Sequence, residues 1–68
     1  MMTLQDQLDA LASWEDALER MKRATYEGSA KELRDAVNDA DYVRHHITEG
    51  TGLTPNELTE SIRVWRQL

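Results

Sequence analysis

The stretch "EGSAKE", Glu27 to Glu32, decides the fold. Gly28 tolerates the left-handed backbone conformation that ends many helices, and Ser29 directly after it is a favoured N-cap. In a capping box the Ser29 hydroxyl accepts a hydrogen bond from the Glu32 amide, and the Glu32 carboxylate accepts one from the Ser29 amide. One helix therefore ends and another begins with almost no linker, which predicts an antiparallel pair.

Helix-period segments lie on both sides of this turn, and no alternating strand pattern is present. Thr3 can cap the first segment through the amide of Asp6, and Gly50 and Gly52 are expected to break the second. We therefore expect one all-α domain over residues 1–68, a small helical bundle of two long antiparallel helices (an αα-hairpin) plus a short third helix. The predicted helices span about residues 4–27, 30–49 and 55–67.

The stretch "TGLTPNEL" carries the signals of a third helix start. Thr54 is the expected N-cap, Pro55 occupies the first helical position, and Glu57 completes a capping box. Leu53 and Leu58 occupy the two positions of a hydrophobic staple. All of these signals concern the stability of a helix N-terminus.

The longer stretch "ITEGTGLTPNEL", Ile47 to Leu58, resembles the turn of helix-turn-helix regulators, where a glycine, an apolar residue and a Ser/Thr-Pro start precede the recognition helix. This resemblance implies a DNA-binding module that uses the third helix. The chain departs from the pattern at Thr48 and Thr51, where such motifs place apolar residues. The third helix also begins with acidic residues and offers basic ones only later: Glu57 and Glu60, then Arg63 and Arg66.

Composition narrows the classes of function. Thirteen acidic and eight basic residues give a net charge of -5, which disfavours nucleic-acid and anionic-membrane binding. The chain has no cysteine, which excludes disulfides and thiolate zinc sites. No apolar run approaches the roughly 20 residues of a membrane span, and the amino terminus has no basic n-region. We expect a soluble cytoplasmic protein, with an acidic DNA mimic or a small assembly component as further alternatives.

The apolar residues of the first helix, among them Leu18, cover roughly 200° of arc, too wide for one neighbour. The third helix, about 20 Å long against about 35 Å for the first, covers only part of it. We therefore expect a homodimer built on the first helix, with an alanine stripe that lets a second helix approach and with large anchors beside it. The predicted interface residues are Ala10, Trp14, Ala17, Met21 and Ala24; alternatively, Trp14 and Met21 are core of the monomer.

The apolar residues of the other two helices predict less. Val37 belongs to the one-sided apolar arc of the second helix, Trp65 to the apolar face of the third, and Tyr26 is expected to close the first turn over the core. Tyr42 and Val64 fall off the buried faces. A second binding patch is predicted from four residues: Tyr42, His46, Val64 and Trp65.

Catalysis and cofactors are not expected. Asp41, His45 and Glu49 share one helix face and could hold a metal, but exposed polar residues near a helix C-terminus are the more ordinary interpretation. No phosphate-binding loop or nucleophile motif is present. The sequence predicts a non-enzymatic protein that binds another protein as an inhibitor or adaptor, of the kind that phages and other mobile elements encode.

Overall fold

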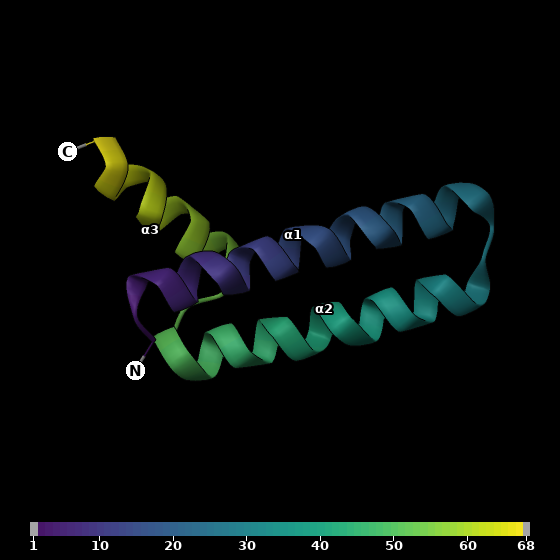
Figure 1. Ribbon diagram of the computed structural model, residues 1–68, viewed down its shortest axis with the longest axis horizontal. Helices are drawn as coiled ribbons and strands as arrows, with labels where there is room; N and C mark the ends of the chain where they lie inside the picture. The colour runs from purple at the N-terminus through teal and green to yellow at the C-terminus, as the bar shows by residue number, and fades with distance from the viewer. Residues whose placement is uncertain (1, 68) are drawn as a thin grey trace.

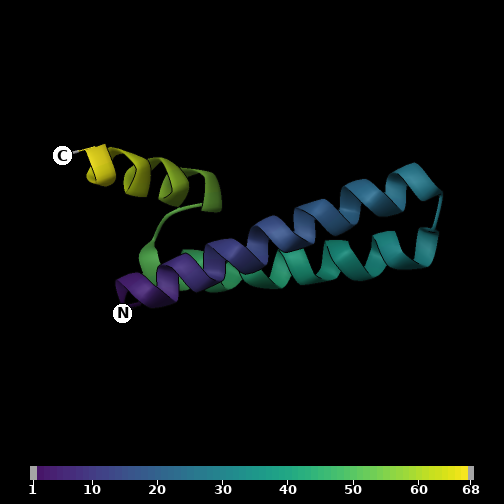
Figure 2. The same ribbon diagram turned by 45° about the horizontal axis from the view of Figure 1, so that its top comes forward.

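The computed structural model describes residues 2–67, and over these residues the chain forms three α-helices and no strand (Figure 1). α1 spans Leu4–Glu27, α2 spans Ala30–Thr51 and α3 spans Pro55–Gln67. α1 and α2 run antiparallel and side by side, while the shorter α3 lies near the first half of α1 (Figures 1 and 2). The predicted all-α fold, an αα-hairpin with a short third helix, is confirmed. Within the described range, no helix is long and apolar enough to cross a membrane.

α1 begins with a complete capping box. The Asp6 amide donates to the Thr3 hydroxyl at 3.1 Å, and the Thr3 amide donates to the Asp6 carboxylate at 3.4 Å. Two backbone amides without a partner inside the helix are thereby satisfied, and the Asp6 charge lies at the positive end of the helix dipole. The start of α1 agrees with the sequence prediction.

The turn between α1 and α2 satisfies the last carbonyls of α1. Gly28 has a φ of 72°, and its amide donates to the Thr25 carbonyl at 3.3 Å. The Ser29 amide donates to the Ala24 carbonyl at 3.0 Å, which completes a Schellman motif. The Ser29 hydroxyl accepts from the Glu32 amide at 3.4 Å, as predicted. The reverse half of the predicted capping box is not made, because the Ser29 amide is already bonded to α1.

α2 runs two residues beyond its predicted end at Glu49. Gly50 lies inside the helix, and Gly52, with a φ of 75°, is the residue that ends it by donating its amide to the Thr48 carbonyl at 2.8 Å. A Cβ atom at Gly50 would collide with the side chain of Met2. Gly50 therefore provides space for the N-terminal residues and does not break the helix.

α3 begins as its sequence predicts. The Glu57 amide donates to the Thr54 hydroxyl at 3.1 Å, and the Thr54 amide donates to the Glu57 carboxylate at 3.0 Å. The hydrogen bond that the carboxylate accepts from the Thr54 amide lowers the pKa of Glu57, and the Thr54 side chain lowers it further. Pro55 is buried at the first helical position, and the Thr51 hydroxyl accepts from the Leu53 amide at 3.1 Å to shape the turn before it.

The hairpin has two unlike ends. The three-helix end comprises residues 2–15 and 42–67, where α3 packs on the hairpin; the two-helix end comprises residues 16–41, which contain only the second half of α1, the turn and the first half of α2 (Figures 1 and 2). The core of the three-helix end consists of Ala10, Leu11, Ile47 and Leu58, with Met2, Trp14, Val43, Leu53 and Ile62 packed against it. In the two-helix end the buried residues are all alanines: Ala17, Ala24, Ala36 and Ala40.

Candidate protein-interaction surface

The alanine stripe predicted to receive a second copy is buried inside the chain. Ala10 lies in the core of the three-helix end, and Ala17 and Ala24 are 0% and 1% exposed. Over the second half of α1 the neighbouring helix is α2, while α3 lies near the first half (Figure 1). We therefore attribute the burial of Ala17 and Ala24 to α2 of the same chain. The small side chains do allow a second helix to approach, but that helix is α2. These three alanines are therefore not available to another copy, contrary to our expectation.

The two large anchors of the predicted interface are only partly covered. Trp14 is half-buried and packs against the core of the three-helix end, and Met21 is half-buried in the two-helix end. Neither side chain is fully enclosed by the chain. Their assignment to an interface remains a prediction, with part of each side chain available to a partner.

Leu18 and Val37 are far more exposed than their place on apolar faces predicts. Leu18 on α1 is 40% exposed and Val37 on α2 is 44% exposed. The reason is the position of α3: the α1 residues that line the hollows between α3 and α1 extend from Leu4 only as far as Glu15. Leu18 lies one helical turn beyond this region, so no third helix covers it.

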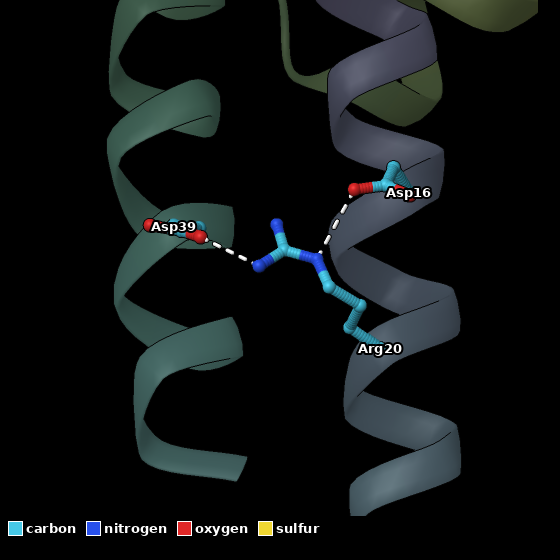
Figure 3. A network of polar contacts seen from close by, with 3 residues as sticks. All are labelled: Asp16, Arg20 and Asp39. Carbon is cyan, nitrogen blue, oxygen red and sulfur yellow. Dashed lines mark hydrogen bonds and ion pairs between the residues drawn. The ribbon is translucent and has the colours of Figure 1, made fainter. Parts of the chain in front are cut away.

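A bridging arginine marks one edge of the two-helix end. Arg20 Nη1 donates to Asp39 Oδ2 on α2 at 2.7 Å, and Arg20 Nε donates to Asp16 Oδ2 at 3.1 Å (Figure 3). The hydrogen bond with Asp39 raises the pKa of Arg20, so the guanidinium stays charged. All three side chains are substantially exposed to solvent, and they line an open hollow together with Tyr42.

Two exposed apolar residues of the two-helix end, Leu18 and Val37, lie on the opposite edge. Residues two apart in an α-helix project about 160° apart. Leu18 therefore projects away from Arg20, and Val37 away from Asp39, with the buried alanine faces of α1 and α2 between them. Trp14 and Met21 lie four residues before and three after Leu18, on the same side of α1. We call this surface the open strip: Trp14, Leu18, Met21 and Val37.

The candidate metal ligands do not converge. His45 Nε2 lies 2.9 Å from Glu49 Oε1, but the Asp41 carboxylate pairs with Arg44 at 2.7 Å. This hydrogen bond with Arg44 lowers the pKa of Asp41. Within residues 2–67, no group of three or more acidic, histidine or cysteine side chains is arranged to hold a metal ion.

The second predicted patch is spread over separate surfaces. Tyr42 and His46 line one open groove between α1 and α2, together with the acidic residues Asp6, Asp9 and Glu49. Trp65 lines a different hollow, formed by α3 with Leu4 and Gln7 of α1. Tyr42, Val64 and Trp65 are all exposed, as expected for members of a binding patch, although Trp65 was also placed on the apolar face of the third helix.

The position of Tyr26 differs from its prediction. Tyr26 is 93% exposed, so the prediction that it closes the turn over the core is wrong. It lies beyond the last buried alanine of α1, where the two-helix end has no apolar core to receive it.

On α3, Arg63 Nη1 pairs with Glu60 at 3.4 Å, so one of the two arginines of the helix-turn-helix hypothesis has an acidic neighbour. DNA binding through α3 remains a prediction.

Sequence reasoning missed the open strip as a unit. Helical periodicity placed Leu18 and Val37 on apolar faces but could not show where α3 stops along α1. The length difference between the first and third helices was the available signal, and it led to the expectation that part of α1 stays uncovered.

A scan against models of protein families and searches of curated proteins and of solved structures found no significant match for this chain.

Proposed function

We propose that this chain is a non-enzymatic protein that acts by binding another protein through the open strip. The observation that carries the proposal is the exposure of Leu18 and Val37 on the same edge of the two-helix end. Apolar side chains exposed together on a small protein are typical of an interaction site, whereas isolated ones are ordinary. Trp14 and Met21 beside them are residue types enriched at the centres of interfaces.

The shape of the surface supports helix-face recognition. Leu18, Met21 and Val37 of the strip belong to the two-helix end, where α1 and α2 run side by side without a third helix (Figures 1 and 2). Trp14 borders them from the three-helix end. An amphipathic helix or a second hairpin that placed its apolar face there would complete the layer missing from the two-helix end. Binding of this kind requires no cofactor and is compatible with an inhibitor, an adaptor or a homodimer.

Photo-crosslinking tests the proposal directly. We would introduce p-benzoylphenylalanine in place of Leu18 in the full chain, irradiate cells of the natural source, and identify the adducts by mass spectrometry. We expect a discrete protein adduct from position 18, because the probe lies in the centre of the open strip. The matched control places the same amino acid at Asn38, an exposed position of α2 that projects away from α1.

A third probe in place of Tyr42 tests the alternative groove between α1 and α2. Adducts from position 42 with none from position 18 would move the binding site to that groove and contradict the proposal. Equal labelling from positions 18 and 38 would also contradict it, because it would show that Leu18 meets other proteins only by random collision. An adduct from position 18 that is absent at position 38 supports it.

A further inference from the structure

We infer that the partner at the open strip is a second copy of this chain, held in an antiparallel twofold arrangement in which Glu15 of each copy faces Lys22 of the other. This inference rests on the proposed function and names the occupant of the same surface. Glu15 and Lys22 lie three residues before and four residues after Leu18, so all three project from one side of α1. Both charged residues are exposed.

Neither charge has an ion-pair partner within residues 2–67. Arg20 on the opposite edge, by contrast, is paired with both Asp16 and Asp39. The edge that carries the open strip thus presents an acidic and a basic side chain on either side of an apolar centre. A partner that places the reverse order of charges against this edge would complement both.

A second copy in antiparallel orientation has this order of charges. Glu15 and Lys22 lie at equal distances from the point midway between Leu18 and Glu19. A twofold axis through that point therefore places Glu15 of each copy beside Lys22 of the other, and symmetry makes two such pairs. A parallel arrangement in register would place like charges together, which is unfavourable. Charge complementarity therefore selects the antiparallel pair.

The arrangement also suits the shape of the molecule. It places the two-helix ends of both copies against each other, so that α1 and α2 of one copy and those of the other form a four-helix layer. The α3 helices flank this layer at opposite ends, because each lies near the first half of its own α1 (Figure 1). A chain of 68 residues buries little apolar surface alone, and oligomerisation is one way in which such small domains gain stability.

The net charge of -5 on each copy does not oppose this pairing strongly. At physiological ionic strength the screening length is about 8 Å, so charges away from the contact contribute little. The charges beside the strip therefore determine the preferred orientation. These charges determine how the two copies are oriented, while burial of the open strip drives their association.

Charge reversal with sedimentation equilibrium tests the inference. We would measure the dimer dissociation constant of the wild type, Lys22→Glu, Glu15→Lys and the double variant Glu15→Lys with Lys22→Glu. Each single reversal is expected to weaken the dimer by about tenfold or more, because it creates two like-charge contacts by symmetry. The double variant is expected to recover most of the wild-type affinity, since it restores opposite charges in the same positions.

Controls separate this effect from damage to the fold. Lys31→Glu makes the same charge change on α2 away from the strip and is expected to leave the dissociation constant unchanged. Glu15 lies near Arg63 and Arg66 of α3 in a hollow of the same chain, so Lys22→Glu, which lies clear of α3, is the cleaner single variant. Circular dichroism at 222 nm would confirm that each variant remains helical.

The outcomes distinguish this inference from the proposed function. A wild type that sediments as a monomer across the series would overturn the inference, while crosslinks from position 18 to a different protein would still support the proposed function. A dimer that responds equally to Lys22→Glu and Lys31→Glu, or that is not restored by the double reversal, would overturn the antiparallel pairing. A dissociation constant that is weakened in both single variants and restored in the double variant would support the antiparallel pairing.

Discussion

The three-helix end and the two-helix end of this molecule are built from the same pair of helices but are packed differently. In the first, Leu11, Ile47 and Leu58 from three helices form a core of large side chains. In the second, only alanine side chains are buried, and the larger apolar residues Leu18 and Val37 remain exposed at one edge. A methyl group buries far less apolar surface than a leucine side chain, so hydrophobic stabilisation is concentrated at the three-helix end.

This difference in packing follows from the short length of the third helix. α3 closes the core at one end and thereby leaves the apolar edge of the other end uncovered (Figure 2). The alanines keep α1 and α2 in contact there without a large core. Under the proposed function, one end of this chain of 68 residues supplies the stability and the other supplies the binding surface.

The largest effect is expected where the core is largest. Ile47 is 0% exposed, and Ile47→Ala should lower the free energy of unfolding by about 2–5 kcal/mol through lost burial and a cavity. Urea unfolding followed by circular dichroism measures this change. Val37→Ala is the matched control in the two-helix end; its cost should stay below about 1 kcal/mol, because the side chain is already partly in water and alanine favours helix. Equal losses in the two variants would remove the distinction between the ends.

The stability of the two-helix end should be sensitive to added side-chain volume, whereas that of the three-helix end is sensitive to lost volume. Ala17→Leu places three extra carbon atoms at a position with 0% exposure, and we expect it to destabilise the chain by about 1–3 kcal/mol through separation of α1 from α2. Ala12→Leu, at an exposed position on the same helix, should change stability by only about 0.5 kcal/mol in either direction. If Ala17→Leu were tolerated as well as Ala12→Leu in thermal unfolding, close packing by alanine would not hold this end together.

Local features of the chain, such as helix ends, were predictable from the sequence. Which helix covers each apolar face was not. Gly28, Ser29 and Thr54 act through hydrogen bonds with residues a few positions away, so their sequence neighbours are sufficient to predict the helix ends beside them. The direction in which Ala17 projects was also predictable from helical periodicity. Which helix would cover it, α2 or that of another copy, depends on the relative position of whole helices. Leu18 was misjudged for the same reason, because its exposure depends on where α3 stops along α1.

The helix caps offer a finer comparison of the two ends. Thr54 belongs to a complete capping box, whereas Ser29 makes only the forward half, because its amide is bonded to Ala24. Thr54→Ala should cost about 1–2 kcal/mol and Ser29→Ala about 0.5–1 kcal/mol, measured by urea unfolding. The Thr54 hydrogen bond also fixes the start of α3, which helps close the core around Leu58. A larger loss from Ser29→Ala would mean that the turn of the two-helix end limits stability.

The smallest expected effect is a difference in acid sensitivity. The Thr54 hydrogen bonds lower the pKa of Glu57 below its ordinary value of 4.5. A carboxylate with a lowered pKa in the folded state contributes stability that is complete above the unfolded value and is lost as the pH falls through the folded one. Glu57→Gln keeps an oxygen acceptor but no charge, so wild type should be the more stable protein at about pH 6 and should lose this advantage as the pH falls below the ordinary value of 4.5. Urea unfolding of both proteins at several pH values measures the gap, in which the titration of the other carboxylates cancels. A gap independent of pH would show that the charge of Glu57 does not stabilise the start of α3.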